Sequence, residues 1–295
     1  MANKPLVTVV LPTFNRAHVL NCAIDSALNQ TYTNFELFVV DDGSNDDTCS
    51  VVNSYSDERI CYEYQNNQGA NVARNRGIKN SNGEIISFLD SDDEYLPNRL
   101  SRCVEIFNET EAAGVFHSYL GVKNGDELYQ RDAPRGYISL KDAKQRNPIG
   151  SFSATMFHKS VFDTVGYLDE EMPAKQDYEF YIRVLKQFDL FGIDEVLMHH
   201  HRLPDSIGTS PTSHEEAYKM ILNRHGDILG DGFKARSTYS LGMKYASNAE
   251  LSPARVWFKK SIRLNPFRLK AYLRYLATFC GKQGYDLIDR IGARV

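Results

Sequence analysis

The chain has 295 residues, a formal net charge of −4 at pH 7, 42% hydrophobic residues and 24% charged residues. A chain of this length buries roughly three quarters of the surface that its unfolded form exposes, and its composition excludes disordered and fibrous proteins. No segment reaches the ~18 apolar residues of a membrane span, and the apolar run in MANKPLVTVVLPTFNR is too short for a signal peptide. We therefore expect a soluble, cytoplasmic protein with one large or two modest domains.

The five cysteines are scattered along the chain and include no CxxC pair. An odd number of widely spaced cysteines is typical of reduced thiols in a cytosolic protein, and it argues against a disulfide framework or a zinc site.

The first hundred residues alternate between β-branched apolar runs and segments with helical spacing. Strands are expected at LVTVVLP, FELFVV, ICYEYQ and EIISFLD, and helices at AHVLNCAIDSALNQ, DDTCSVVNSYS and GANVARNRGIKN. This alternation predicts βαβ units and a doubly wound, mixed but mostly parallel α/β sheet flanked by helices.

The middle of the chain, up to about residue 210, is more mixed. A hairpin is expected around Lys123–Asp126. SATMFHKSVFDTVG predicts a strand that leads into a helix, QDYEFYIRVLKQF an amphipathic helix, and FGIDEVLMHHHR a strand that ends in histidines. We assign residues 1–210 to this α/β domain.

Residues 211–295 have a helical pattern and form a predicted helical extension. The spacing in YSLGMKYASNAELSPARVWFKKSIRLNP is similar to one tetratricopeptide repeat, a helix–turn–helix unit. A single repeat cannot bury its own apolar face, so it is expected to pack on neighbouring helices. An unrelated helical hairpin is the alternative.

Charge is distributed unevenly between the two parts of the chain. Residues 251–295 contain ten Lys/Arg and two Asp/Glu, a balance of +8, whereas the first 250 residues carry −12. A basic C-terminus on an acidic body suggests peripheral contact with an anionic membrane surface at the inner face of the cell membrane. A solvated helix face is the alternative.

Polar clusters follow three of the predicted strands: PTFNR after the first, DDGSNDD after the second and DSDDE after the fourth. In a doubly wound sheet, ligands bind beyond the carboxyl ends of the strands, where such loops meet. The three loops therefore predict one site.

The stretch EIISFLDSDDEYLPNRL places four carboxylates within five residues, directly after an apolar strand. Like charges this close repel each other, and a hard divalent cation such as Mg²⁺ or Mn²⁺ would relieve the repulsion. A nucleotide diphosphate could then bind despite the acids. In the alternative, Asp93 or Glu94 caps the following helix, which would need only one acid.

Three further segments contain candidate site residues. Asp42 ends a strand and could accept hydrogen bonds from a base or ribose, with Gly43 allowing a tight turn. Arg74 could contact phosphate or neutralise the acidic loops. Asp177 stands at the start of an amphipathic helix, where an N-cap is the default interpretation, and among the histidines His199 and His201 are expected on one face of their strand.

Taken together, VVLPTFNR, FELFVVDDGSNDDT, NQGANVARNRG, GEIISFLDSDDEYLPNRL and QDYEFYIRV resemble, in order and spacing, the family 2 inverting glycosyltransferases. The resemblance covers about residues 7–210 and implies the nucleotide-diphospho-sugar transferase (GT-A) fold. It implies that Asp92 binds the metal directly, that Asp90 contacts the ribose or the metal through water, and that Asp177 is the catalytic base. This chain has Gln176–Asp177 where the family usually has Glu–Asp.

By the same resemblance, Asp42 contacts uracil or ribose, Arg74 the base or phosphate, and His201 approaches the metal. The nucleotide-sugar pocket would also include Pro12, Thr13, Phe14, Asn15, Arg16, Gly43 and Ser91. The implied function is transfer of a sugar, with inversion, from a UDP-sugar to a glycan or lipid-linked acceptor hydroxyl in surface polysaccharide or glycoconjugate synthesis. No nucleic-acid partner is expected.

Two other functions are compatible with this kind of fold. A sugar-1-phosphate nucleotidyltransferase would share the nucleotide-binding half, but it should have a glycine-rich loop after the first strand, and LPTFNRAH contains no glycine. A non-catalytic scaffold with a protein-binding helical tail is the second possibility.

Overall fold

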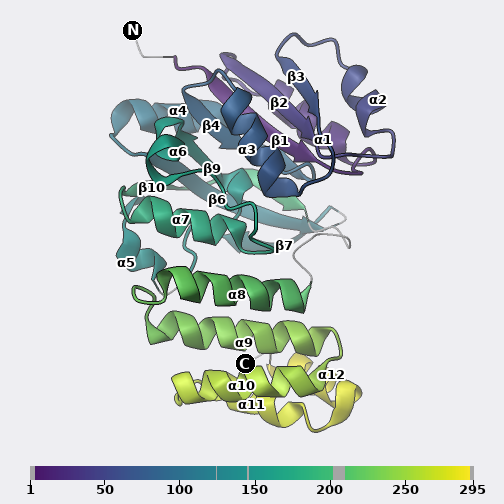
Figure 1. Ribbon diagram of the computed structural model, residues 1–295, viewed down its shortest axis with the longest axis vertical. Helices are drawn as coiled ribbons and strands as arrows, with labels where there is room; N and C mark the ends of the chain where they lie inside the picture. Colours follow the sequence, from purple (N-terminus) through teal and green to yellow (C-terminus); the bar gives the residue numbers. More distant parts are fainter. Residues whose placement is uncertain (1–3, 124, 145, 202–209, 293–295) are drawn as a thin grey trace. The chain divides into compact units, whose positions relative to one another are not determined.

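The computed structural model describes residues 4–123, 125–144, 146–201 and 210–292. Of these, the residues within 1–140, 148–171 and 176–204 form one compact unit, and those within 141–147, 172–175 and 205–295 form a second. The first unit contains the α/β part and the second the C-terminal helices (Figure 1). Two short segments from the middle of the chain thus belong to the second unit, which the sequence pattern did not indicate.

The central element of the first unit is a ten-stranded sheet with the order β3-β2-β1-β4-β9-β6-β10-β5, to which β7 and β8 add at β6 and β10. Its strands are β1 (Val7–Thr13), β2 (Phe35–Asp41), β3 (Ile60–Tyr64), β4 (Ile85–Phe88), β5 (Asp93–Tyr95), β6 (Gly114–Lys123), β7 (Asp126–Arg131), β8 (Gly136–Ile138), β9 (Thr155–His158) and β10 (Leu190–His201).

The sheet is mixed, as predicted, and its parallel part is smaller than the sequence pattern indicated. β3, β2, β1 and β4 pair in parallel, and β6 pairs in parallel with β10. β9 is antiparallel to both β4 and β6, and β5 is antiparallel to β10. Antiparallel neighbours need no crossover helix, so the alternation of strands and helices predicts only the first half.

Helices cover both faces of the parallel half. The helical segments before residue 210 are α1 (Leu20–Leu28), α2 (Thr48–Asn53), α3 (Ala70–Asn80), α4 (Arg99–Glu109), α5 (Leu140–Ala143), η1 (Phe152–Ala154), α6 (Ser160–Val165) and α7 (Gln176–Leu185). Val9 and Leu11 of β1 share a core with Ile24 of α1 and Leu100 of α4. Because both faces of β1 and β4 are buried, these two strands consist mostly of apolar residues and do not alternate with exposed polar ones.

The other face of β1 approaches α3 at a glycine. A Cβ atom built on Gly77 would lie 2.6 Å from Cγ1 of Val10, which is fully buried. Gly77→Ala would gain about 1 kcal/mol of helix propensity, but overpacking a rigid core costs about 1–3 kcal/mol. We expect the clash to dominate and to lower the free energy of unfolding measured by urea denaturation. A more stable variant would contradict this expectation.

The order β3-β2-β1-β4 places a switch of direction between β1 and β4. The second strand of the chain lies on one side of β1 and the fourth on the other, so the loops that follow β1 and β4 border the crevice where open α/β sheets bind ligands. These are two of the loops in which the sequence predicted a site.

The second unit contains α8 (Pro211–His225), α9 (Asp231–Ser247), α10 (Leu251–Leu264), α11 (Leu269–Ala277) and α12 (Gly281–Gly292). α9 and α10 form the helix pair expected in the repeat-like segment, and they approach closely where Gly242 faces the ring of Phe258. The Ser261 hydroxyl donates to the Ala235 carbonyl at 2.7 Å. Within the described part of the chain, no helix has the length and apolarity needed to span a bilayer.

Candidate active site

The loop after β1 is held against the loop after β2. Asn15 has a positive φ of 52°; its backbone N–H donates to Ser44 Oγ at 2.8 Å, and its side-chain oxygen accepts from the Asn45 N–H at 2.8 Å. Asp46 accepts from the backbone N–H groups of Ala17 and Thr48. Asp46 therefore accepts a hydrogen bond from the first residue of α2 and also connects the two loops.

The other predicted residues of the first loop differ in exposure. Pro12 and Thr13 belong to β1 and are buried, Arg16 is half-buried, and Phe14 is 43% exposed. An exposed aromatic ring beside buried polar groups is suited to contact with a planar base.

Asp42 is buried and organises the loop that follows β3. Its Oδ1 accepts from Gln65 Nε2 at 2.7 Å and from the Gln68 N–H at 2.9 Å, and its Oδ2 accepts from the Gly69 N–H at 2.8 Å. Gly43 has φ +88°, and an added Cβ would lie 2.7 Å from the Asn67 nitrogen. Only glycine fits this turn, so Asp42 and Gly43 together hold the entry to α3.

Arg74 on α3 forms an ion pair with Asp90. Its Nη2 lies 2.5 Å from Asp90 Oδ1, its Nη1 donates to Asn71 Oδ1 at 3.3 Å, and its guanidinium lies 5.1 Å from the centre of the Phe152 ring. The Asp90 backbone N–H donates to Ser153 Oγ at 3.0 Å. Neighbouring Ser91 is buried. The structure therefore brings together two residues that the sequence placed in the same site.

The acids that follow Asp90 repel one another. Burial and the charges of Asp93 and Asp90 raise the pKa of Asp92 to about 7, although the charges of Arg16 and His200 oppose this shift. The Asp93 side chain is fully buried, and its Oδ2 has no hydrogen-bond partner among the described residues. Carboxylate oxygens are the donors that Mg²⁺ and Mn²⁺ prefer, so this set fits a hard divalent cation.

The capping alternative for these acids is excluded. Asp93 and Glu94 belong to β5, and α4 begins after Asn98 with no acidic residue in its first turn. The sequence pattern did not indicate β5, because three residues with two acids lack the apolar alternation of a strand. β5 forms a strand because it pairs with the C-terminal end of β10. This pairing is long-range and cannot be recognised in the local sequence.

The three histidines at the end of β10 alternate in direction, as expected for a strand. His199 Nδ1 lies 3.0 Å from Glu94 Oε2, and His201 Nε2 lies 3.5 Å from the same oxygen. His200 points to the other side, where its Nδ1 lies 2.8 Å from Asp93 Oδ1. Burial opposes a charge there, but the hydrogen bond to Asp93 and the charges of the neighbouring acids raise the pKa of His200 to about 9.

His200, which the sequence analysis did not select, is thus the histidine that faces the acidic loop. Among the described residues, His201 belongs instead to a group with Cys22 and Glu94 whose potential ligand atoms lie within 4.8 Å of one another. The role of His201 as a ligand of the catalytic metal stays a prediction.

Asp177 lies in the first turn of α7, one residue inside the helix and not at its N-cap. Burial, followed by the neighbouring Tyr129, raises the pKa of Tyr119 to about 12, with Arg131 opposing the shift and the charges of Asp177 and Asp93 adding to it. The Tyr119 ring lies 5.7 Å from that of His200. Tyr119 thus lies against His200, the histidine that is hydrogen-bonded to Asp93.

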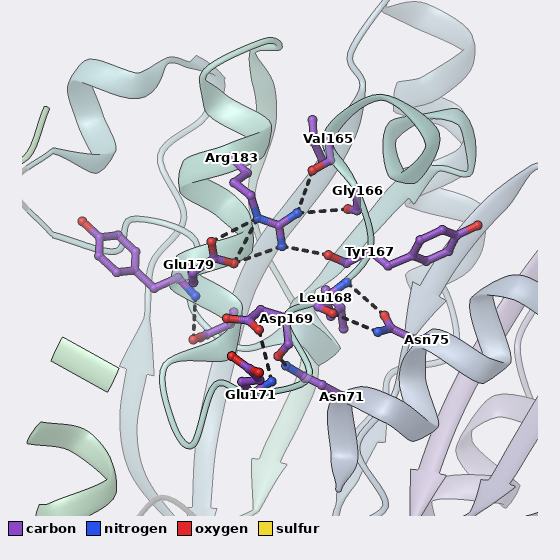
Figure 2. Close-up of polar contacts among 12 residues, drawn as sticks. Asn71, Asn75, Val165, Gly166, Tyr167, Leu168, Asp169, Glu171, Glu179 and Arg183 are labelled. Atoms are coloured by element: carbon purple, nitrogen blue, oxygen red, sulfur yellow. Dashed lines mark hydrogen bonds and ion pairs between the residues drawn. The ribbon is translucent and has the colours of Figure 1, made fainter. Parts of the chain in front are cut away.

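Figure 2 shows that side chains from α3 and α7 hold the segment Val165–Asp169 between them. Arg183 on α7 donates to the carbonyls of the first three residues at 2.8–3.0 Å. Asn75 on α3 exchanges two 2.9 Å hydrogen bonds with the Leu168 backbone, and Asn71 donates to the Asp169 carbonyl at 2.6 Å. Five successive carbonyls are thus bonded by three side chains.

This segment, which we call the α3–α7 clamp, joins the helix of Arg74 to the helix of Asp177. Arg183 is itself held by Glu179, 3.0 Å away and nearly fully buried. The clamp has no clear pattern in the amino-acid sequence. An acid and an arginine four residues apart in QDYEFYIRV were a visible signal, but such pairs are common on exposed helix faces.

A second missed residue is Arg99, at the start of α4, which is fully buried. Its guanidinium donates to four neutral acceptors from separate parts of the sheet region: Ser87 Oγ, His117 Nε2, Ser153 O and Thr155 O. Burial, followed by the charge of Arg99, holds the pKa of His117 well below its usual range. His117 is therefore neutral and accepts from Arg99. The Ser153 hydroxyl also accepts from the Asp90 N–H, so Ser153 connects Arg99 to the acidic loop.

A mixed α/β sheet of this topology, with acids and arginines at the crevice, defines a protein of the nucleotide-diphospho-sugar transferase (GT-A) class. Residues 8–166 match the family described as Glycosyl transferase family 2. An uncharacterized glycosyltransferase from Rickettsia typhi is 32% identical over 90% of this chain and 84% of its own length. The chain belongs to glycosyl transferase family 2, and the protein is a glycosyltransferase.

Two further relatives are named for particular pathways or reactions. The putative colanic acid biosynthesis glycosyl transferase WcaA of Escherichia coli K12 is 30% identical over 82% of this chain and 88% of that protein. The E. coli UDP-Glc:alpha-D-GlcNAc-diphosphoundecaprenol beta-1,3-glucosyltransferase WfgD is 29% identical over 77% of this chain and 86% of that protein. The family thus includes similar enzymes of polysaccharide synthesis.

Solved structures agree in fold along nearly the whole chain. Staphylococcus aureus TarS 1-349 in complex with UDP-GlcNAc has a TM-score of 0.68 at 18% identity, covering 98% of this chain and 92% of that one. The mannosyltransferase PcManGT from Pyrobaculum calidifontis, in complex with GDP-Man and Mn²⁺, has a TM-score of 0.62 at 16% identity, covering 98% and 87%.

Proposed function

We propose that the protein is a metal-dependent, inverting glycosyltransferase that moves a sugar from a UDP-sugar to an acceptor hydroxyl in surface polysaccharide or glycoconjugate synthesis. One observation carries the proposal: Asp90 of the DSDD loop is paired with Arg74, and the buried carboxylate of nearby Asp93 has one oxygen without a hydrogen-bond partner among the described residues, as a cation-binding loop would. Sugar transfer requires a site that stabilises the leaving diphosphate and a base that accepts the proton of the acceptor, and Asp177 on α7 is the proposed base.

The choice of donor and acceptor rests on similar proteins. TarS binds UDP-GlcNAc, and WfgD uses UDP-Glc and a diphosphoundecaprenol-linked acceptor. PcManGT binds GDP-Man, so a GDP-sugar is the competing donor. A lipid-linked acceptor is proposed for this chain from the WfgD relationship, with action at the cytoplasmic face of the membrane.

In the proposed mechanism, Asp177 accepts the proton of the acceptor hydroxyl while that oxygen attacks C1 of the sugar and the bond to the diphosphate breaks. Attack from the side opposite the leaving group inverts the anomeric centre. Arg74 and Arg16, beside the acidic loop, lower the energy of the charge that develops on the diphosphate. A Mg²⁺ or Mn²⁺ ion held by Asp92, with Asp90, would supply further stabilisation of that charge.

The binding pocket is proposed to include the loop after β1 and the turn after β2. Asp42, whose carboxylate holds the loop before α3, would line this pocket and contact uracil or ribose. The other proposed contacts are Pro12, Thr13, Phe14, Asn15, Arg16, Gly43 and Ser91. We also propose that residues 1–210 constitute the transferase domain and 211–295 a helical extension.

A donor screen tests the proposal most directly. Purified protein is melted with UDP-, GDP-, dTDP- and CMP-sugars, each with Mn²⁺ and with EDTA, and donor hydrolysis is measured in parallel. We expect one UDP-sugar to raise the Tm only when metal is present, because nucleotide phosphates alone are repelled by the acidic loop. No Tm shift and no hydrolysis with any nucleotide would overturn the proposal and would leave a non-catalytic scaffold.

Asp92→Asn is expected to abolish the metal-dependent part of the Tm shift. The amide removes a charged ligand and also part of the repulsion within the acidic loop, so the variant without ligand should be at least as stable as the parent. Asp126→Asn, an exposed acid on the β6–β7 hairpin, is the matched control and should behave like the parent. Retention of the full metal-dependent shift in Asp92→Asn would remove Asp92 from the metal site.

A further inference from the structure

The helix α11 in the second unit has its large apolar side chains on its exposed side. Leu269, Tyr272, Leu273 and Leu276 follow the spacing of one helix face and are 78%, 39%, 44% and 62% exposed. The opposite face, which packs inward, carries small residues such as Ala271 and Ala277. Amphipathic helices of globular proteins normally have the reverse orientation.

The exposed apolar face continues beyond both ends of α11. Phe267, just before the helix, is 91% exposed, and Phe279, just after it, is 57% exposed. We call this surface the α11 apolar stripe; it consists of Phe267, Leu269, Tyr272, Leu273, Leu276 and Phe279. A contiguous apolar surface of this kind marks an interaction site, whereas single exposed apolar residues do not.

The chain around the stripe is strongly basic, and the acid that follows it, Asp286 of α12, is paired with Lys282. Residues 251–285 contain eight Lys/Arg and no Asp/Glu, and Lys259, Lys260, Arg263 and Lys270 are exposed. A partner of this surface must therefore be apolar where the stripe lies and anionic around it.

We propose that the α11 apolar stripe docks on the surface of an anionic phospholipid bilayer. The apolar side chains would enter the boundary between headgroups and acyl chains, and the lysines and arginines would contact lipid phosphates. Tyr272 combines an apolar ring with a polar hydroxyl, as aromatic residues at membrane interfaces do. A second copy of the chain fits less well, because a twofold interface places the same patch on both sides and so opposes two cationic surfaces.

Vesicle co-sedimentation of the full chain tests the proposal without any nucleotide or acceptor. Vesicles of phosphatidylcholine alone are compared with vesicles that also contain phosphatidylglycerol. We expect binding to the anionic vesicles only and a loss of binding at high salt, since exposed charges are screened. Because no donor is involved, failure here would not bear on the transferase proposal.

Two variants separate the apolar and the electrostatic contributions. Leu273→Gln/Leu276→Gln should weaken binding at least tenfold, because two apolar side chains no longer enter the bilayer. Lys259→Gln/Lys260→Gln should weaken it about fivefold for each lysine. Leu128→Gln alters an exposed leucine of β7 in the first unit, 48% exposed, and should bind like the parent. All of these positions are at the surface, so folding should be retained, as the melting temperature would show.

Three results would overturn the proposal. The first is the absence of binding to anionic vesicles, and the second is equal loss of binding in Leu128→Gln and in the stripe variant. The third is a concentration-dependent dimer, seen by light scattering, that the stripe variant abolishes while vesicle binding persists. The last result would assign the stripe to a second copy of the chain.

Discussion

Asp177→Asn is expected to lower kcat by about 10²–10⁴-fold, the usual contribution of a general base, while binding of the nucleotide-sugar changes little. The amide has nearly the same size as the carboxylate and can occupy the first turn of α7, but it cannot accept a proton from the acceptor hydroxyl. Kinetics with the donor identified in the screen would show the fall in kcat, and the metal-dependent Tm shift would show that the donor still binds.

The matched control for this variant is Asp163→Asn, which removes an exposed acid from α6 and should leave kcat unchanged. Gln176→Glu restores the Glu–Asp pair usual in the family and tests whether the acceptor side tolerates a second charge. If Asp177→Asn retains full turnover, the base must be sought elsewhere.

Arg183→Met is expected to destabilise the first unit by about 3–5 kcal/mol, the usual cost of breaking a buried ion pair. The substitution leaves the Glu179 carboxylate, only 2% exposed, without its arginine, and it also frees the carbonyls of Val165, Gly166 and Tyr167. Urea denaturation would measure the loss as a lower free energy of unfolding.

The double variant Glu179→Gln/Arg183→Met separates the two costs. It removes the stranded charge, so it should recover part of the stability, and the remaining loss reports the three carbonyl hydrogen bonds. A double variant that is no more stable than Arg183→Met would show that the Glu179 charge is not the reason for the loss.

The same clamp should affect catalysis through geometry. The segment Val165–Asp169 is bonded to α3, which carries Arg74, and to α7, which carries Asp177. Asn75→Ala, which removes two hydrogen bonds to Leu168, should lower kcat more than it raises KM for the donor, because the base is displaced relative to the reacting atoms. An unchanged kcat in a folded Asn75→Ala protein would limit the clamp to stability.

Much of the fold could be predicted from local patterns. The apolar runs at β1, β2 and β4 reflect burial between two layers, and the helical spacing of α1, α3 and α7 reflects burial of one helix face; both are visible in the local sequence. The loops at the carboxyl ends of β1, β2 and β4 could be grouped into one site because parallel strands place such ends at one edge. These features depend on residues close in sequence.

Other features depend on partners that are far apart in the chain. β5 is a strand only because β10, about a hundred residues later, pairs with it, and this pairing decides that His200 faces Asp93 while His199 and His201 face Glu94. Arg74 could be expected near phosphate, but its ion pair with Asp90 could not be foreseen, since an arginine in a helix leaves no trace of its partner in the sequence.

The amino-acid sequence was enough to predict the parallel half of the sheet and the acidic loop, because each has a local pattern that chemistry makes recognisable, whereas Asp177 was selected as the candidate base only through the family resemblance. Three features became visible only in the folded protein: which histidine meets the acids, how Arg99 and the α3–α7 clamp support the site, and that α11 turns its apolar face outward. Each of these outcomes depends on long-range packing, which satisfies buried polar groups or leaves an apolar face uncovered through contacts that sequence spacing does not encode.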